Sequence, residues 1–424
     1  MRGDTPGTFN GLMFGESLLV KASWIVILAG LLNSCSVISS AQVDVSVAPS
    51  KSLYIAGEPV FVVASIANNG TTPLTIVVPP PDSCISSMTV FIEGLSRSDQ
   101  TPCADPNTNL CVYDGPPSEL VQIRPGAQYK MQRLMNLFYD LRQAGLYHAH
   151  VSFHLEYADR PALEGKYSFQ QRNFDHRVVL NVENGQAGDL LAAFSPIIMD
   201  LESADTSRRR YARMVLLTLA PRFAEDRILA LADQQDLETA AMPALRRLGT
   251  PATINKLESV AFETSDGDPV HERQRLSALE QIKYLHDGSL LPKLYEVTEE
   301  NRGQSIRWAA ASAAARIGHA EAVPEIAKML ADPDPLIVFA GAEALGDTSS
   351  RAAVGILISA IPAASHGNVL PAIVEALGRL THQKTSSDPN ERAAIYKQWS
   401  DWWAIHGANA TIYDPETCGV IGQL

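Results

Sequence analysis

The sequence predicts a multidomain protein of the all-β plus all-α class, in which a β-sandwich is followed by an α-solenoid. Three observations support this prediction: a short apolar run near the N-terminus, hydrophobic residues with period two up to about residue 182, and a helical period with recurring units after it. With 424 residues, the chain is long enough for two or three domains with cores of their own.

The charge balance excludes one class of partner. The chain is 46% hydrophobic and 19% charged, as is ordinary for globular domains, and its formal net charge is −13. Nucleic-acid binding needs clustered Lys and Arg, so we expect no nucleic-acid partner. The basic run Arg208-Arg209-Arg210 is interpreted as the solvated first turn of a helix.

Residues 1–41 are predicted to be an export signal. The apolar run 24–32 follows Lys21 and is too short to span a membrane, which takes about 20 residues. The small residues 39–41 offer a cleavage point before Gln42, which would give a secreted or periplasmic protein. The alternative is a lipoprotein box ending at Cys35, and only lipidation there would attach the chain to a membrane.

Export would allow disulfides to persist. The remaining cysteines are Cys84, Cys103, Cys111 and Cys418, and they allow three pairings. Cys103 and Cys111 bracket a loop rich in Pro, Asn and Asp and form the natural local pair. There is no Cys-x-x-Cys pair, so we predict no zinc ribbon.

Residues 42–183 are predicted to form the sandwich. Val43, Val45 and Val47 alternate with polar residues, and further strands are expected over 60–66 and 74–78. The turns between them contain Gly57-Glu58-Pro59 and Asn68-Asn69-Gly70, the latter expected to supply residues that tolerate positive φ. Residues 79–117 are expected to be strands joined by a long loop.

Residues 144–149 resemble the tyrosine corner of immunoglobulin-like domains. In that motif a tyrosine near the start of a late strand, here Tyr147, bonds the preceding turn. The second cysteine of the family pattern is replaced by Ala149, so the inter-sheet disulfide of antibody domains is absent. The phrases 54–60 and 124–126 also resemble bacterial immunoglobulin-like modules, including the proteinase-inhibitor-like kind.

Residues 189–406 are predicted to form the solenoid. Apolar helical stretches end at Gly249, Gly318, Gly346 and Gly378, with His286 filling the gap. The successive spacings are 37, 32, 28 and 32 residues, the range of a two-helix repeat. We expect each glycine to take the left-handed conformation that ends a helix. One apolar face recurs in three helices: Val323, Ile326, Ala327 and Leu330; Val354, Leu357, Ile358 and Ile361; Leu370, Ile373, Val374 and Leu377.

Residues 332–346 resemble the HEAT-like repeats of the phycobilisome-lyase type, whose unit reads roughly Asp-Pro-Asp-Pro-x-Val-Arg-x-Ala-Ala-x-Ala-Leu-Gly. The resemblance extends over about 190–380. The arginine of the family is replaced by Val338 and kept in the preceding unit as Arg307, so we expect an incomplete Asp–Arg ladder between repeats. The resemblance implies the fold and leaves the function open.

The last helix carries Tyr396, Trp399 and Trp403 on one face. A solenoid must cover its last repeat, so we interpret these aromatics as an end cap rather than a sugar or peptide site. Residues 407–424 are predicted to be a C-terminal tail.

Two groups of residues resemble metal-binding sites. His148, His150 and His154 share one face of a strand, and His176 is a candidate for completing a metal site from a later strand; a solvated outer face explains the row equally well. His271-Glu272 begins like a zinc-protease helix, but Arg275 stands where the second histidine is needed. We therefore predict no catalytic, cofactor-binding or metal-binding residues.

These observations predict a non-enzymatic, extracytoplasmic scaffold for protein–protein interaction, whose partner is another protein. Two alternatives remain open. Relatives of this repeat type include bilin lyases, so the solenoid could be enzymatic. The sandwich could instead act as a proteinase inhibitor.

Overall fold

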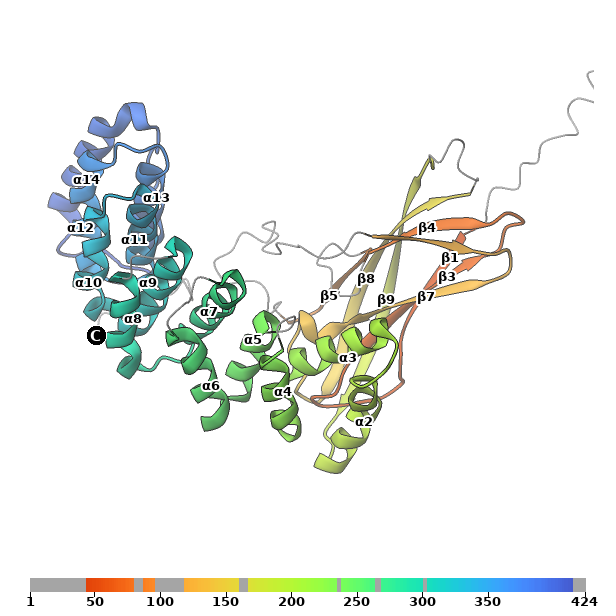
Figure 1. Cartoon of the computed structure of the whole chain (residues 1–424). Helices are drawn as coiled ribbons and strands as arrows, with labels where there is room; N and C mark the ends of the chain where they lie inside the picture. The colour runs from red at the N-terminus through yellow and green to blue at the C-terminus, as the bar shows by residue number, and fades with distance from the viewer. Residues whose placement is uncertain are drawn as a thin grey trace, which may run out of the picture.

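A computed structural model describes residues 43–79, 87–95, 118–159, 167–234, 238–263, 268–299 and 303–414. A β-sandwich occupies the N-terminal part and a helical solenoid the rest, as the sequence predicts (Figure 1). The predicted signal and all five cysteines lie outside the described residues, so cleavage, lipidation and disulfide pairing stay predictions.

The sandwich consists of two sheets. The first has three antiparallel strands in the order β1 (Val43–Pro49), β3 (Phe61–Asn68), β7 (Gln128–Leu134). The second has the order β2 (Tyr54–Ile55), β9 (Gln170–Glu183), β8 (Gly145–Ala158), β4 (Leu74–Val78), β6 (Glu119–Ile123), with β5 (Met88–Ile92) also paired to β8.

Side chains that point inward from both sheets form the core of the sandwich. Val43 and Val45 are buried while Asp44 and Ser46 are exposed, and the same alternation runs along β8. The three strands predicted near residues 43, 60 and 74 are confirmed. The turn after β3 differs from expectation, because none of Asn68, Asn69 and Gly70 has positive φ. In the turn before β3, Gly57 does. Buried Asn68 holds that turn through hydrogen bonds with Gly70 N and the carbonyls of Thr72 and Ile123.

The tyrosine corner is confirmed. The Tyr147 hydroxyl donates to the Gln143 carbonyl at 2.7 Å, four residues upstream at the entry to β8. Ala149, where the family has a cysteine, is buried in the core.

The solenoid has two layers of helices (Figure 1). One layer contains α3 (Thr206–Leu219), α5 (Glu238–Leu248), α7 (Pro269–Ile282), α9 (Gln304–Gly318), α11 (Pro335–Asp347) and α13 (Val369–Thr381). The other contains α2 (Ala187–Asp200), α4 (Glu225–Ala232), α6 (Pro251–Phe262), α8 (Leu291–Glu299), α10 (Val323–Ala327), α12 (Arg351–Ala360) and α14 (Arg392–His406). Among the described helices, none combines the length and hydropathy that crossing a membrane requires.

The repeated apolar face lies in the shared core of the solenoid. Every predicted position on α13, on α12 and on the turn that follows α12 is buried. In the third helical stretch, residues 323–330, Val323 and Ile326 are buried, while Ala327 and Leu330 are partly exposed. Neighbouring repeats bury each other's faces, which is why no single helix pair would be stable alone.

The expected role of the repeat glycines is wrong at three of four positions. Gly249 has φ +61, but Gly318 has φ −93, and Gly346 and Gly378 lie inside helices. The left-handed residues that follow are His319, Ser349 and His382. Gly346 is instead required for close packing, since a Cβ there would lie 2.9 Å from the Ala376 Cβ.

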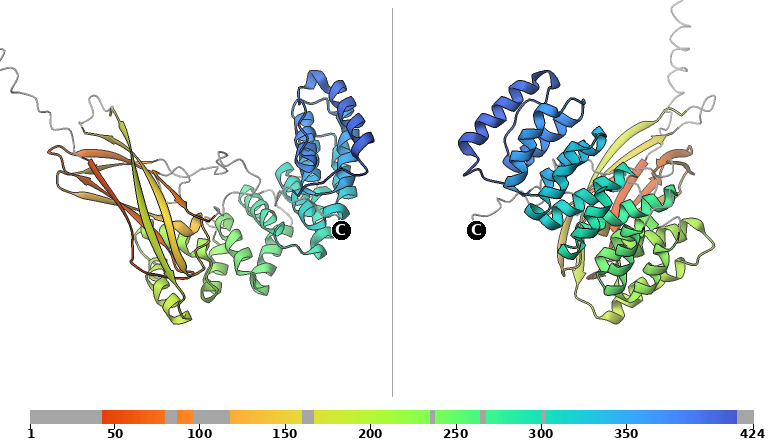
Figure 2. Two further views of the ribbon diagram at one scale, coloured as in Figure 1. Left: turned by 180° about the vertical axis from the view of Figure 1, so that it is seen from behind. Right: turned by 60° about the vertical axis from the view of Figure 1, so that its left-hand side comes forward.

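The two halves of the chain share a packed junction. The rings of Phe61 on β3 and Tyr211 on α3 lie 5.7 Å apart, and Leu134 of β7 is part of the solenoid core. The sandwich and the solenoid are therefore packed against each other. The solenoid curves away from the sandwich and ends at α14 (Figure 2).

The far end of the solenoid is closed by α14 and the first part of the tail. Trp399 is only 1% exposed and its Nε1 donates to Thr385 Oγ1 at 3.0 Å. The Tyr413 ring stacks on His382 at 3.6 Å, and Arg351 donates to the Ala410 carbonyl. This packing agrees with the end-cap interpretation for Trp399 and Trp403, whereas Tyr396 is 40% exposed and is not part of the cap.

Candidate binding face on the inner helical layer

The odd-numbered helices line the inner side of the bend, on the side of the sandwich (Figures 1 and 2). Neighbouring helices of this layer approach closely at small residues: a Cβ on Gly346 of α11 would lie 2.9 Å from the Ala376 Cβ of α13. The even-numbered helices lie on the outer side of the bend, so the odd-numbered layer forms the concave face (Figure 1).

Four helices of this layer each expose to solvent a stripe of residues spaced four apart. Four stripes lie side by side: Arg273, Ser277 and Gln281 on α7; Trp308, Ser312 and Arg316 on α9; Phe339, Glu343 and Asp347 on α11; Pro371, Glu375 and Arg379 on α13. All twelve are partly or fully exposed, while most of the residues between them are buried. A spacing of four residues keeps side chains on one helical ridge. We call these twelve residues the concave grid.

The N-terminal row of the grid is aromatic at its centre. The rings of Trp308 and Phe339 meet edge to face at 5.6 Å, and Trp308 remains 41% exposed. Leu336, in the first turn of α11, is also exposed. Large exposed apolar side chains inside an ordered concave face are typical of binding sites for other macromolecules.

The α5–α9 end of the concave face is basic. Three cations approach the Tyr284 ring: Arg246 at 4.8 Å, Lys283 at 5.3 Å and Arg316 at 6.0 Å. Arg246 also donates to the neutral Gln281 side chain at 2.9 Å, whereas Lys283 is paired with Glu280 and Arg316 lies 3.9 Å from Asp347.

The α11–α13 end is acidic. Glu343, Asp347 and Glu375 surround the Arg379 guanidinium, which lies 3.8 Å from Glu343 and 3.9 Å from Asp347. Burial raises the pKa of Glu343; Arg379 opposes this shift, while Glu375 and Asp347 add to it. The carboxylates are thus crowded, and Arg316 reaches Asp347 at 3.9 Å from the neighbouring helix.

A cleft of about 960 Å³ lies at the N-terminal ends of α7, α9 and α11. Arg307 spans it, donating to Asp332 at 2.7 Å and to the Thr298 carbonyl at 2.7 Å. Burial would raise the pKa of Asp332, but hydrogen bonds from Asp334 N and Arg307 outweigh it and hold the pKa below its usual value. This is the Asp–Arg pair of the repeat, and Val338 cannot extend it from α11, so the ladder is incomplete as predicted.

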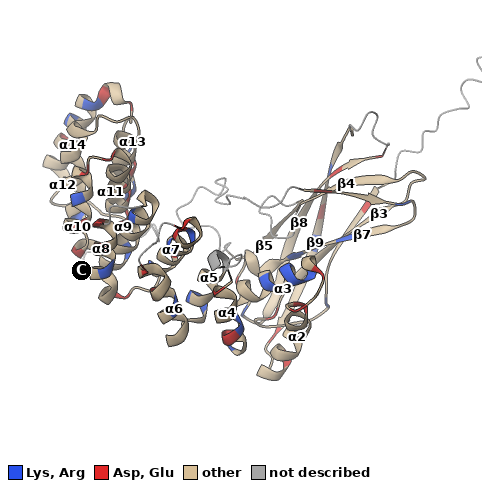
Figure 3. Cartoon of the chain, viewed as in Figure 1, with Lys and Arg blue, Asp and Glu red and all other residues tan. Residues whose placement is uncertain are grey.

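Other arginines bind helix C-terminal carbonyls. Arg275 donates to Ala261 at 3.0 Å, Arg247 to Leu217 at 2.5 Å and Arg392 to Ala364 at 3.0 Å. These contacts satisfy carbonyls that a helix end leaves free and place positive charge at the negative end of the dipole. Figure 3 shows both charge signs distributed along the helices.

The predicted reading of Arg208-Arg209-Arg210 as a helical first turn is confirmed. Asp205 caps α3, and Arg208 pairs with Asp200 at 2.5 Å while Arg209 donates to the Ser203 carbonyl at 2.6 Å. Arg275 stands where a zinc-protease helix would have its second histidine. Its side chain is buried and donates to the Ala261 carbonyl, which is a structural contact.

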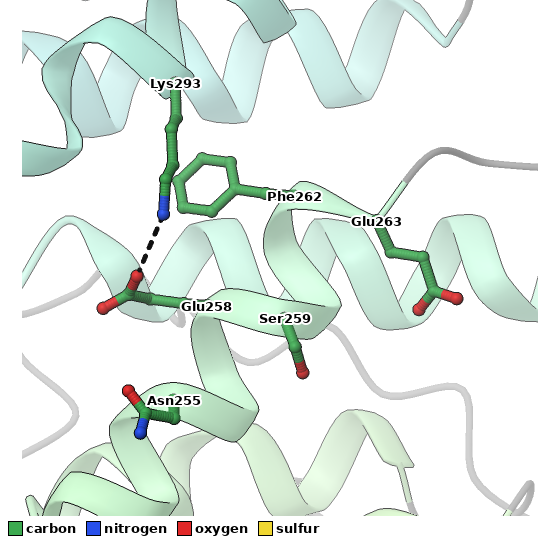
Figure 4. A pocket seen from close by; sticks show the side chains of 6 residues that line it. All are labelled: Asn255, Glu258, Ser259, Phe262, Glu263 and Lys293. Atoms are coloured by element: carbon green, nitrogen blue, oxygen red, sulfur yellow. Dashed lines mark hydrogen bonds and ion pairs between the residues drawn. The ribbon is translucent and has the colours of Figure 1, made fainter.

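A second hollow lies on the convex side, between α6 and α8 (Figure 4). Lys293 of α8 reaches Glu258 of α6 at 3.3 Å, and its ammonium lies 5.1 Å from the centre of the Phe262 ring. These contacts tie the two helices together. We therefore interpret the hollow as a gap between two helices of the outer layer.

The histidine row lies on the outer face of the six-stranded sheet. His150 bonds Glu93 at 2.6 Å and His154 bonds Asn173 at 2.7 Å. His176 pairs with buried Val151 and so points to the inner face, away from the row. The idea that it completes a metal site is therefore wrong, and no group of three or more metal-binding side chains occurs among the described residues.

Sequence reasoning missed the concave grid. The signal was present as residues four apart within each unit, recurring at repeat spacing from 273 to 379. In each of these helices the apolar positions that repeat at the same spacing are the stronger pattern, and they predict only the buried face.

Comparison with known proteins supports the helical fold. The HEAT-repeat family model matches residues 291–378. No curated protein matches the chain.

Three solved structures are similar to parts of the chain. Human deoxyhypusine hydroxylase in complex with glycerol is 18% identical, with 51% of this chain and 86% of that chain covered and a TM-score of 0.20. Trypsin-activated alpha-2-macroglobulin from Escherichia coli is 11% identical, with 85% and 29% covered and a TM-score of 0.21. The native form of that protein is 11% identical, with 84% and 26% covered and a TM-score of 0.20.

The chain spans less than a third of the length of the two macroglobulin structures. The match to the HEAT-repeat model does not confirm the phycobilisome-lyase type of repeat. The protein is thus a β-sandwich joined to an α-solenoid, and residues 291–378 of that solenoid match the HEAT-repeat family model.

Proposed function

We propose that the protein is a non-enzymatic scaffold that binds another protein on its concave grid. The single observation that supports this most is the exposed Trp308–Phe339 pair, set in an ordered face of four parallel stripes. HEAT repeats commonly bind proteins through such extended concave surfaces. The exposed Trp308–Phe339 pair would anchor the partner, and the polar side chains around it would orient the partner.

We also propose that the protein works outside the cytoplasm. This rests on the apolar run at 24–32 and on its flanking residues. Cell fractionation followed by N-terminal sequencing of the mature protein tests it: a start at Gln42 supports cleavage, a blocked start at Cys35 supports lipidation, and an uncleaved cytoplasmic chain contradicts both.

The binding proposal is tested by chemical crosslinking of the full-length protein in an envelope extract. The expected result is that Trp308→Ala combined with Leu336→Ala abolishes a specific crosslinked partner. Tyr396→Ala is the matched control, since it removes an exposed aromatic ring from α14 on the other layer. Partners that persist in the double variant, or that disappear equally in the control, contradict the assignment of the face.

A further inference from the structure

A small pocket lies at the N-terminal end of α11, between that helix and α13. Its volume is about 220 Å³, and Val338 of α11 lines it together with Val369 and Ile373 of α13. Val338 is the fourth residue of α11, as Arg307 is of α9. Arg307 spans the cleft of the preceding unit and reaches Asp332. Val338 is too short to reach across in the same way, so the corresponding space in its own unit stays open as a pocket.

The pocket gives a basic side chain no free acid to pair with. Among the described residues that line it, Asp332 carries the one carboxylate, and Arg307 pairs with that carboxylate at 2.7 Å. At the repeat spacing of 32 residues, the position that corresponds to Asp332 in the next unit is Ala364, whose carbonyl accepts a hydrogen bond from Arg392 at 3.0 Å. A cation in this pocket would lose hydration without gaining a counter-charge, so charge complementarity favours a neutral occupant.

Most side chains that line the pocket are apolar. Ten of the thirteen described lining residues are Ala, Val, Leu, Ile or Pro, and the other three are Asp332, Ser365 and His366. Small-molecule sites usually measure about 300–1,000 Å³, so a cavity of about 220 Å³ suits a single large side chain better than a whole ligand. Water in such a pocket finds few hydrogen-bond partners, and an apolar group that displaces it gains free energy.

We propose that this pocket receives one aliphatic or aromatic side chain of the protein that binds the concave grid. The inference rests on the proposed function and adds a second anchor point to it. Around the circumference of α11, Phe339 lies between Pro335, which lines the pocket, and exposed Leu336. The pocket is therefore continuous with the Trp308–Phe339 pair, and one partner side chain buried in it fixes the register of the partner on the face.

Small analogues of single side chains test the chemistry of the pocket directly. Toluene and indole stand for phenylalanine and tryptophan, and methylguanidinium and propionamide stand for arginine and glutamine. Titrations followed by saturation-transfer difference NMR on the full-length protein measure the binding of each analogue. Toluene and indole are expected to bind about tenfold or more tightly than the other two, because only they gain free energy by leaving water for an apolar pocket.

Two substitutions fill the pocket in different ways. Val338→Arg introduces the long side chain that Arg307 has one unit earlier, and Ala363→Leu fills the pocket with an apolar group from its exposed rim. Both are expected to weaken the binding of toluene and indole about tenfold. Ala352→Arg and Ala352→Leu are the matched controls, because they add the same side chains at an exposed position near the start of α12, outside the pocket. The controls should keep wild-type binding.

The crosslinking assay then links the pocket to the partner. Val338→Arg and Ala363→Leu should each lose the partner that the Trp308→Ala and Leu336→Ala double variant loses, whereas the two Ala352 variants should keep it. Equal binding of the four analogues, no binding of any of them, or unchanged binding in both filled variants overturns the apolar pocket.

Loss of toluene and indole binding with an unchanged crosslinked partner overturns the assignment of the pocket to the partner. In that case, if the partner still depends on Trp308, the scaffold function stands and only this inference fails. If the filled variants lose the analogues while no variant of the concave face or of the pocket loses a partner, the proposed function itself fails.

Discussion

At the residue scale, small residues and shared charges decide how the solenoid packs. Gly341 lies in the middle of α11, where a Cβ would be 2.7 Å from the Met329 Cβ. Glu343, two residues later, carries a carboxyl group whose pKa is raised by burial and by neighbouring carboxylates. Gly341 allows α11 to lie close to Met329, and the raised pKa of Glu343 makes the stability of this face depend on pH.

Gly341→Ala is expected to lower the free energy of unfolding by about 1–3 kcal/mol, because the new methyl group overpacks a rigid contact. Gly355→Ala in α12 is the matched control. Its Cβ would meet only Trp403 Nε1, at 3.7 Å, so helix propensity should raise stability by about 0.5–1 kcal/mol. Urea denaturation measures both. Equal effects of the two substitutions would show that close approach is not the reason for Gly341.

Glu343→Gln is expected to stabilise the protein relative to wild type increasingly as pH rises. A carboxyl group with a raised folded-state pKa contributes its stability below the ordinary pKa and loses it as pH rises through the raised value. The amide variant does not lose that contribution. Urea denaturation at about pH 4, 5.5 and 7, from near the ordinary pKa of Glu to well above it, should give a growing difference between the variant and the wild type. A difference that shrinks with pH contradicts the raised pKa.

At the scale of single elements, the last helix closes the solenoid. Trp399 of α14 is buried, packs edge to face on Trp402 at 5.6 Å, and donates to Thr385. Terminal repeats must cover a face that interior repeats cover for each other. The aromatic cluster on α14 supplies that cover.

Trp399→Ala should cost about 3–5 kcal/mol, because it empties a large buried volume. Tyr396→Ala, on the exposed part of the same helix, should cost less than about 1 kcal/mol. Thermal denaturation gives the stabilities, and limited proteolysis should locate new cleavage within α12 to α14. A small effect of Trp399→Ala would mean that α14 is not the structural cap.

At the scale of the whole molecule, the junction fixes the sandwich against the first repeat. Phe61 and Tyr211 meet there, and burial raises the pKa of the Tyr211 hydroxyl. That hydroxyl has no hydrogen-bond partner among the described residues, so the ring and not its polar atom holds the junction.

Phe61→Ala is expected to cost about 3 kcal/mol and to free the two halves from one another. Small-angle X-ray scattering should then show a broader distribution of interatomic distances. Tyr211→Phe keeps the ring and removes a buried unsatisfied group, so stability should stay level or rise by about 1 kcal/mol. If Phe61→Ala leaves the scattering curve unchanged, the halves are held together elsewhere.

The sequence by itself determined the fold class. Period-two alternation located strands such as β1 and β4, and the recurring apolar face predicted the buried sides of α12 and α13. Tyr147 could be assigned because its hydrogen bond reaches only four residues back. These features are local, and local patterns are legible in a sequence.

Only the tertiary structure decided which residues face a partner. The positions of the repeat glycines predict helix ends. Gly346 is instead required for the close contact of α11 with α13, about thirty residues later in the chain. His176 looked like a fourth ligand, but strand register turns it to the inner face. The concave grid arises from four helices stacked side by side, and the sign of charge at each end depends on which repeats become neighbours. Those relations form only when the layers pack, and for that reason the face was not predicted.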